Sequence, residues 1–448
     1  MKPRPGLPPG PYLVVGLARS GVAAALALHR RGERVVGVDA GEPDGLQELR
    51  AAGIELCLGG PGTALLEGMG TLVKSPGVPA EAPVVAQART RGICTIGELE
   101  LAWRMLPGEF LAVTGTNGKT TTVELIGHIH RQASLPAVVA GNVGLALSAL
   151  VGQVGAGVTI VCEASSFQLE DTLAFSPEAA VLLNVSADHL DRHHTLEAYE
   201  AAKLQAFARQ EAQDVAVVPT GFRGGSLPGK ARRVNFGSEP QAQLSERSDG
   251  MLCWQGQPLI AASEIALQGR HNLQNAMAAA AVCLARGVDP DGVRAGLRSF
   301  PGVPHRLEEV ARKGGVLFVN DSKATNVAST LVALAAMAEQ GSGEEPNVHL
   351  ILGGQGKSQD FAALSPALVS GCRAVYLIGE DAPAIAAGIG ETGVVVHQCG
   401  RLDRAVAAAD AAAGEGEIVL LSPGCASFDQ FRDFEARGER FRELVLGR

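Results

Sequence analysis

The segment from residue 111 to 122, Leu-Ala-Val-Thr-Gly-Thr-Asn-Gly-Lys-Thr-Thr-Thr, carries the residue types of a triphosphate-binding loop. Glycines let main-chain N–H groups turn toward phosphate oxygens, a lysine supplies positive charge, and a threonine hydroxyl can reach Mg²⁺. Val113 stands where the GxxxxGK[ST] pattern has its first glycine, so only the part from Gly115 to Thr120 is present. The apolar run before this loop and the helical pattern after it favour phosphate binding over an ordinary strand–helix turn.

A carboxylate and a histidine follow two further apolar runs. Glu163 comes after the expected strand 158–162, where it can bind Mg²⁺ or position a water molecule; a solvated turn glutamate is the alternative. His189 lies in Asp-His-Leu-Asp-Arg-His-His after the next strand. A lone histidine is usually structural, but together with Glu163 it becomes a candidate metal ligand or proton acceptor.

Lys203 is one of only eight lysines among 38 basic residues, and it falls on the apolar stripe of an expected helix over 196–209. Tyr199 precedes it by four residues and Phe207 follows it by four. One interpretation is a side chain whose stem covers the core while its ammonium reaches water. The other is a partly desolvated amine with a lowered pKa, which could capture CO₂ and bind Mg²⁺ as a carbamate.

The N-terminal block contains a weaker glycine pattern. Gly16-Leu-Ala-Arg-Ser-Gly21 approximates GxGxxG, with Ala18 at the middle glycine, and Asp39 ends the second expected strand. A tight turn, an NAD site and a uridine nucleotide site all fit this pattern, and Lys74-Ser-Pro-Gly77 could line the same crevice.

Three polar segments follow strands of the C-terminal block. They are Asn320-Asp-Ser-Lys-Ala-Thr-Asn326, Gly353-Gly-Gln-Gly-Lys357 and Ser422-Pro-Gly-Cys-Ala-Ser427, which continues to Phe434. Each alone could be a solvated loop. Together, at the carboxyl edge of one sheet, they predict an anion pocket that fits a small carboxylate.

These motifs require three α/β blocks to position them. We expect domains at 1–105, 106–302 and 303–448, with a Rossmann-like first domain, a central P-loop domain and a doubly wound third domain. The segment Phe300–Pro304 reads as a proline-containing hinge, and Gly221–Glu246 as loops or hairpins.

Composition narrows the class of protein. With 448 residues, 46% hydrophobic and 19% charged, the chain is typical of a globular protein, and a net charge of −9 argues against nucleic-acid binding. Eight scattered cysteines lack a C-x-x-C pair, and neither a signal peptide nor a membrane-spanning run is recognisable. We therefore expect a cytoplasmic protein without membrane insertion.

Over essentially its whole length the chain resembles the Mur ligase family. The resemblance is carried by Thr114-Gly-Thr-Asn-Gly-Lys-Thr120, Ser165-Ser-Phe-Gln-Leu-Glu170, Asn320–Asn326 and Ser422–Ser427. The last three segments are similar to those of members that add D-glutamate to UDP-N-acetylmuramoyl-L-alanine. The resemblance implies the three-domain Mur ligase architecture, ATP and two Mg²⁺ ions as cofactors, and a monomer that works in peptidoglycan precursor synthesis.

The resemblance also implies a role for each matching residue. The ATP-binding set would be Gly115, Thr116, Asn117, Gly118, Lys119, Thr120, Thr121, Asn272, Asn275, Arg306 and Asp321, with Arg306 at the γ-phosphate. The metal ligands would be Thr120, Glu163, His189 and a carbamylated Lys203. The uridine substrate would meet Arg19, Ser20, Asp39, Gly77 and Asn142, and D-glutamate would meet Lys323, Thr325, Lys357, Ser427 and Phe434. Lys119, His189, Lys203 and Arg306 would serve catalysis.

The expected reaction begins with transfer of the ATP γ-phosphoryl group to the substrate carboxylate, because a carboxylate alone is a poor acceptor for an amine. The amine of D-glutamate, deprotonated through His189, then attacks the acyl phosphate. Three alternatives stay open: a sister ligase that adds another amino acid or extends a folate with glutamate, an NAD-dependent dehydrogenase, and a non-catalytic P-loop switch.

Overall fold

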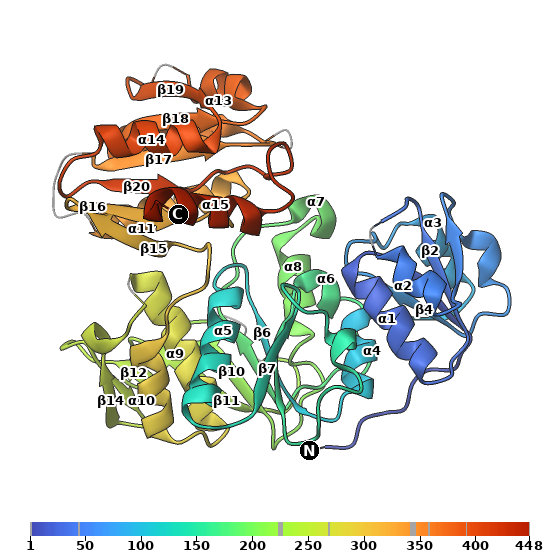
Figure 1. Ribbon diagram of the computed structural model, residues 1–448. Helices are drawn as coiled ribbons and strands as arrows, with labels where there is room; N and C mark the ends of the chain where they lie inside the picture. Colours follow the sequence, from blue (N-terminus) through green and yellow to red (C-terminus); the bar gives the residue numbers. More distant parts are fainter. Residues whose placement is uncertain are drawn as a thin grey trace. The chain divides into compact units, whose positions relative to one another are not determined.

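The computed structural model describes residues 2–43, 45–222, 227–267, 269–340, 346–356, 359–390 and 392–447. It divides into two compact units, Met1–Pro301 and Gly302–Arg448. The first unit contains two β-sheets and the second contains one (Figure 1). The domain bounds expected from the sequence, 1–105, 106–302 and 303–448, stay a prediction.

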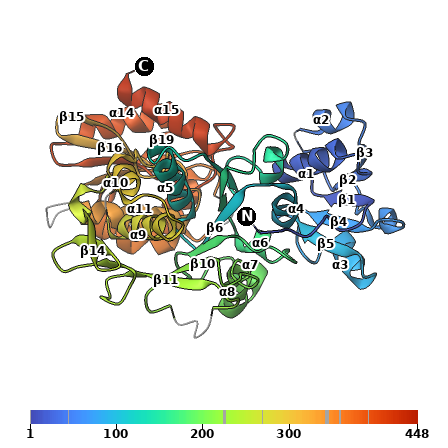
Figure 2. The same cartoon turned by 90° about the horizontal axis from the view of Figure 1, so that it is seen from below.

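The N-terminal sheet is parallel throughout, with strand order β3-β2-β1-β4-β5, which the labels of Figure 2 follow. Apolar strand residues are buried on both faces, as expected for a parallel sheet covered by helices. Its elements are β1 (Tyr12–Val15), α1 (Arg19–Arg30), β2 (Val35–Asp39), α2 (Leu46–Ala51), β3 (Glu55–Leu58), β4 (Thr71–Lys74), α3 (Pro83–Thr90), β5 (Cys94–Gly97) and α4 (Glu98–Met105).

The central sheet has nine described strands in the order β14-β13-β12-β11-β10-β9-β6-β8-β7. Strands β6 to β12 are parallel, whereas β13 and β14 add an antiparallel hairpin at one edge. The helices α5, α9 and α10 pack together, and all three also contact strands of this sheet. Its strands are β6 (Glu109–Thr114), β7 (Ala137–Gly141), β8 (Thr159–Glu163), β9 (Ala179–Leu182), β10 (Val215–Pro219), β11 (Arg232–Gly237), β12 (Leu244–Glu246), β13 (Met251–Trp254) and β14 (Gln257–Ala261). Its helices are α5 (Lys119–Gln132), α6 (Ser166–Leu169), α7 (Leu190–His193), α8 (Leu196–Leu204), α9 (Arg270–Ala285) and α10 (Pro290–Ser299).

The second unit is a doubly wound sheet in the order β15-β16-β20-β17-β18-β19, and among its described strands only β15 is antiparallel to its neighbour. One buried cluster joins the sheet to α11, α12 and α13, and another joins it to α14 and α15. Its elements are β15 (Glu308–Lys313), β16 (Val316–Asn320), α11 (Val327–Gln340), β17 (Val348–Gly353), α12 (Ser365–Gly371), β18 (Cys372–Ile378), α13 (Ala382–Ile389), β19 (Val395–Gly400), α14 (Leu402–Ala412), β20 (Ile418–Leu421) and α15 (Phe434–Leu446).

The α/β class and the strands that carry the motifs are confirmed, but one prediction is wrong. The segment 221–246, expected to form loops or hairpins, contains β11, a parallel strand inside the central sheet. Its polar sequence Arg-Arg-Val-Asn-Phe-Gly hides the strand, because only Val234 and Phe236 are buried. The helix expected over 196–209 also ends earlier, at Leu204.

Candidate active site

The phosphate loop joins β6 to α5. Gly118 lies in the left-handed region with φ 84°, and a Cβ there would come within 2.2 Å of Asn275 Oδ1. The Nζ of Lys119 donates to the carbonyl oxygens of Gly115 at 2.9 Å and Thr116 at 2.8 Å, so its ammonium lies over the loop. At position 118, both the left-handed backbone and the close approach of Asn275 therefore require glycine. Helix α5 begins at Lys119 and directs its N-terminal N–H groups toward this turn.

Glu163 is the last residue of β8, so its side chain belongs to the edge of the strand rather than to the turn after it. It pairs in register with Val113 of β6 and Gly141 of β7, which places it at the carboxyl ends of the central strands. Oε1 accepts a hydrogen bond from Asn142 Nδ2 at 3.1 Å. Oε2 is buried and has no hydrogen-bond partner in the structure.

An unpartnered buried carboxylate oxygen is costly unless a cation or a proton satisfies it. The Oε2 atom of Glu163 lies beside a glycine loop that is followed by Thr120. An oxygen atom in this position fits a divalent cation that prefers oxygen ligands. Within the described ranges, no cluster of three or more His, Cys, Asp or Glu residues that could hold a metal is found.

Lys203 is buried, with 1% of its surface exposed, so the interpretation of an ammonium that reaches water is wrong. Its Nζ donates to the carbonyl oxygen of Gly115 at 2.8 Å and lies 4.1 Å from the centroid of the Tyr199 ring. Burial, helped by the positive charge of Lys119, lowers the pKa of Lys203 to about 7, although the carboxylate of Asp188 acts in the opposite direction. A large share of neutral amine is therefore available near neutral pH.

His189 immediately precedes α7 and has a left-handed backbone with φ 53°. Its ring lies 4.9 Å from that of Phe167 and 6.2 Å from that of Tyr199, measured between centroids. About half of its side chain is exposed. Because the Tyr199 ring contacts both Lys203 and His189, the fold brings these two sequence-predicted residues to one side of the phosphate loop.

Further predicted nucleotide residues of the first unit lie on α9 and at the start of α5. Asn275 is buried against Gly118, and its Nδ2 donates to Asn272 Oδ1 at 3.4 Å. Thr120 and Thr121 are buried in the first turn of α5.

In the N-terminal sheet, Asp39 is bound to the glycine turn itself. Its Oδ2 accepts from Leu17 N at 2.7 Å and its Oδ1 from Gly41 N at 2.9 Å. Arg19 Nη1 donates to Gly144 O at 2.9 Å, two residues from Asn142 of the central sheet. Ser20 faces Ser75, with 3.4 Å between their hydroxyl oxygens, and a Cβ at Gly77 would meet nothing within 4 Å. These five predicted substrate residues therefore belong to one unit.

In the second unit, Asp321 follows β16 and is buried. Its Oδ2 accepts from Ser422 Oγ at 2.8 Å and its Oδ1 from Leu307 N at 3.2 Å. Burial raises the pKa of Asp321 to about 7, against the hydrogen bond from Ser422 and the charge of Arg306. Asp321 and Arg306 are thus electrostatic neighbours.

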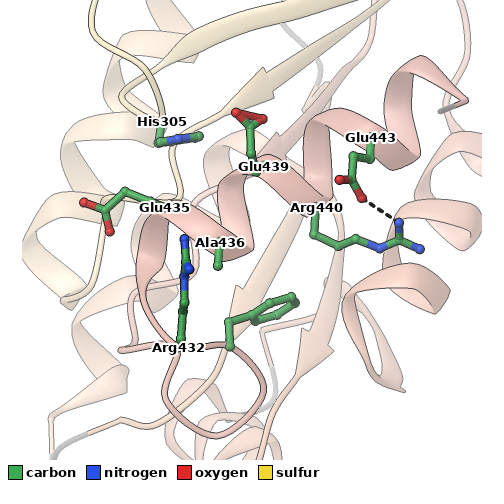
Figure 3. Close-up of a pocket in the computed structure, with 8 residues that line it drawn as sticks. His305, Arg432, Glu435, Ala436, Glu439, Arg440 and Glu443 are labelled. Carbon is green, nitrogen blue, oxygen red and sulfur yellow. Dashed lines mark hydrogen bonds and ion pairs between the residues drawn. The ribbon is translucent and has the colours of Figure 1, made fainter.

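His305, next to Arg306, was not singled out from the sequence. Its Nδ1 accepts from Asn320 Nδ2 at 2.9 Å, and a Cβ at Gly438 of α15 would come within 2.2 Å of the same atom. Figure 3 shows His305 beside α15, at a hollow of about 460 Å³ that Glu435 and Glu439 also line. Gly438 therefore leaves the space in which His305 packs.

Of the predicted D-glutamate residues, Lys323, Thr325 and Ser427 lie on loops that a buried arginine connects, and Phe434 begins α15. Lys323 Nζ is 5.9 Å from the Phe434 ring centroid, Ser427 is buried, and Thr325 is half-buried. Lys357 lies outside the described residues. Arg437, which the sequence reasoning missed, donates to Ser322 O at 2.8 Å and to Cys425 O at 3.1 Å. A signal existed: Arg437, Phe441 and Val445 share one buried face of α15.

Three sequence models of known domains match the chain in succession. They are described as "Mur ligase MurD-like, N-terminal domain" over residues 11–97, "Mur ligase middle domain" over 113–283 and "Mur ligase, glutamate ligase domain" over 305–425. The chain belongs to the Mur ligase family. This membership confirms the resemblance and the three-domain architecture, and it leaves the dehydrogenase alternative without support.

Full-length relatives of this Mur ligase are named UDP-N-acetylmuramoylalanine–D-glutamate ligase. The relative from Acidobacterium capsulatum is 41% identical over 97% of this chain and 95% of its own length. The relative from Bacillus subtilis is 39% identical over 97% of both chains.

Solved structures share the fold of this Mur ligase at lower identity. The UDP-N-acetylmuramate–alanine ligase of Thermotoga maritima is 20% identical, with a TM-score of 0.61 over 98% of this chain and 99% of that one. The MurF ligase of the same organism is 18% identical, with a TM-score of 0.58 over 92% and 96%. No described helix is both long and apolar enough to span a bilayer.

Proposed function

We propose that this chain couples D-glutamate to UDP-N-acetylmuramoyl-L-alanine with hydrolysis of ATP to ADP and phosphate, in peptidoglycan precursor synthesis. The observation that carries the proposal is the match, over 97% of both chains, to a relative named for the D-glutamate reaction. The use of ATP makes the cytoplasm the proposed location, and the enzyme is proposed to act as a monomer.

In this proposal the phosphate loop binds ATP. Lys119 and the N–H groups at the start of α5 would hold the phosphates, with Asn272 and Asn275 at the adenosine. From the second unit, Arg306 would reach the γ-phosphate and Asp321 the adenosine. The residues proposed for ATP therefore belong to both units.

The proposed metal ligands are Thr120 and Glu163 for one Mg²⁺, and His189 with a carbamylated Lys203 for a second. Bound Mg²⁺ would neutralise charge on the transferring phosphoryl group. The unpartnered Oε2 of Glu163 supports the first position. The buried amine of Lys203, with its pKa near 7, supports the second.

Carbamylation would give the buried Lys203 side chain a negative charge. Burial disfavours such a charge unless a bound cation compensates it. The neutral Nζ would attack the carbon of CO₂, an N–C bond would form, and one proton would leave to solvent. The product is an anion that can bind a cation. Lys203→Ala should lose most of its activity and regain part of it with added short-chain carboxylic acids. Full activity without any added acid would contradict the carbamate role.

The peptide-forming step needs an activated acid and a neutral amine. Lys119 and Arg306 would stabilise the charge on the γ-phosphoryl group as it passes to the substrate carboxylate, forming an acyl phosphate. The amine of D-glutamate, held by Lys323, Thr325, Lys357, Ser427 and Phe434, would then attack, with His189 accepting its proton. Arg19, Ser20, Asp39, Gly77 and Asn142 would hold the uridine substrate throughout.

Phosphate release with a panel of amino acids and acceptor nucleotides tests this proposal. Turnover should need ATP, Mg²⁺, UDP-N-acetylmuramoyl-L-alanine and D-glutamate together. Turnover with a different amino acid or with a folate acceptor, and none with D-glutamate, would favour a sister ligase. Absence of ATP turnover with every pair would contradict ligase activity.

A further inference from the structure

A strained turn lies beside the candidate active site. The short helix α7 (Leu190–His193) is bracketed by His189 with φ 53° and His194 with φ 66°, both in or near the left-handed region. Residues other than glycine rarely adopt such conformations, and they persist only where the surrounding structure fixes them. Side chains of this turn must therefore anchor it.

Arg192 provides the most extensive anchor. Its Nη2 donates to Glu170 Oε1 at 2.6 Å, and its Nη1 donates to the carbonyl oxygen of Pro76 at 2.8 Å. The guanidinium carbon lies 4.0 Å from the centroid of the Phe167 ring. The planar guanidinium thus binds a carboxylate, a carbonyl and an aromatic face at once, a combination that a lysine cannot reproduce.

The Phe167 ring continues this contact to His189. Its centroid lies 4.0 Å from the Arg192 guanidinium and 4.9 Å from the His189 ring. The ring of the neighbouring His193 also stacks on the Phe167 ring, with 5.3 Å between the two centroids. His193 Nε2 forms a hydrogen bond with Ser166 Oγ at 3.0 Å. The orientation of His189 is therefore connected to Arg192 through one shared aromatic ring.

The Pro76 carbonyl belongs to the loop 75–78, which follows β4 of the N-terminal sheet. Lys74 holds the far end of this loop by donating to Val78 O at 2.8 Å, and it forms a buried ion pair with Asp171 at 2.7 Å. Ser75 holds the near end by donating to Gly16 O at 2.7 Å. Arg192 is thus the side chain through which α7 contacts the middle of the loop that contains Gly77.

We propose that Arg192 is a positioning residue that couples the N-terminal substrate loop to the divalent-cation position at His189. The inference rests on the proposed function, in which Gly77 borders the uridine substrate and His189 binds Mg²⁺. Ordering of loop 75–78 by the substrate fixes Arg192, and Arg192 with Phe167 fixes His189. Since such coupling is reciprocal, a cation at His189 also tightens substrate binding.

Calorimetric binding of UDP-N-acetylmuramoyl-L-alanine, with and without Mn²⁺, tests the proposal on the full chain. In the unsubstituted enzyme Mn²⁺ should tighten substrate binding by about fivefold or more, within the usual range for coupled sites. Arg192→Gln should bring this factor below twofold, and the KM for the uridine substrate should rise with little change in the KM for ATP. Arg192→Lys, which keeps the charge, carries the test should the glutamine variant not fold.

Arg89→Gln is the matched control. Arg89 also crosses between the two sheets of the first unit, but its Nη2 contacts Asp171 at 3.3 Å rather than the loop 75–78. This variant should keep the Mn²⁺-dependent factor of the unsubstituted enzyme. A factor in Arg192→Gln equal to that of the unsubstituted enzyme, or no Mn²⁺ effect in an enzyme that does bind the substrate, overturns the inference alone. An enzyme that does not bind the uridine substrate overturns the proposed function as well.

Discussion

The Nζ of Lys203 lies 2.8 Å from the carbonyl oxygen of Gly115, so a side chain from α8 reaches the first glycine of the phosphate loop. The Nζ of Lys119 reaches the same oxygen at 2.9 Å. Two lysines therefore converge on one carbonyl, and only one of them is needed to bind phosphate as a cation. The mutual repulsion of their charges favours a neutral Lys203, which is the form that reacts with CO₂.

Replacement of Lys203 by methionine should separate stability from function. The folded-state pKa of Lys203 is about 7, below that of an exposed lysine, so the buried ammonium destabilises the fold fully below pH 7. This cost is relieved as the pH rises from 7 toward 10. In CO₂-free buffer, Lys203→Met should therefore have the higher melting temperature at pH 6, by a margin that shrinks by pH 9, although it is inactive. A margin that does not change with pH would contradict the lowered pKa.

Glu163→Gln tests the buried carboxylate at the end of β8. The amide has the same size but no charge, so binding of a divalent cation should be lost and turnover should fall by about 100-fold or more. Thermal melting supplies the second measurement. Mg²⁺ with a non-hydrolysable ATP analogue should raise the melting temperature of the unsubstituted enzyme more than that of the variant. Equal shifts would argue against Glu163 as a metal ligand.

Gly438→Ala should disturb Arg306 from a distance. The new Cβ would come within 2.2 Å of His305 Nδ1, and displacement of His305 changes the position of the next residue, Arg306. We expect kcat to fall about tenfold, since small misplacements of this kind are costly in catalysis. Gly371→Ala is the control, because a Cβ at that position meets nothing within 4 Å. An equal kcat in both variants would show that the space beside His305 is not needed.

Asp321→Asn addresses the second buried carboxyl group. Burial raises the folded-state pKa of Asp321 to about 7, so its protonated form stabilises the fold below about pH 4, and this contribution is lost as the pH rises through 7. Relative to the variant, the unsubstituted chain should lose stability between pH 5 and pH 8, by a few kcal/mol at most. Guanidinium unfolding of both proteins at the two pH values measures the difference. A constant difference would mean that Asp321 titrates normally.

The sequence predicts the residues that could carry the chemistry more completely than it predicts the strands of each sheet. Most of the motifs that carry a predicted role follow a strand that alternates with helices, and such strands are recognisable because both of their faces are buried. Strand β15 (Glu308–Lys313), with the sequence Glu-Glu-Val-Ala-Arg-Lys, was missed because an edge strand beside solvent needs few apolar residues. Strand β7 (Ala137–Gly141), at one edge of the central sheet, was also missed, although its sequence Ala-Val-Val-Ala-Gly is apolar.

Side-chain contacts between distant segments were the harder part. The apolar stripe of one helix is enough to mark Lys203, because Tyr199 and Phe207 lie four residues away on either side. Arg192 has no such stripe, and the spacing of Arg437 with Phe441 and Val445 marks a buried face of α15 without identifying the partners of the guanidinium. Their partners come from loops distant in sequence, such as Pro76 and Cys425, and only the folded chain brings these carbonyl groups within reach.

Carbon-13 NMR of the enzyme in ¹³C-bicarbonate tests the central claim that Lys203 acts as a carbamate. At pH 8 with Mg²⁺, one carbamate resonance should be present in the unsubstituted enzyme and absent from Lys203→Met. Its intensity should fall as the pH is lowered below 7, in parallel with activity. Full ligase activity with no carbamate resonance under these conditions would contradict the account.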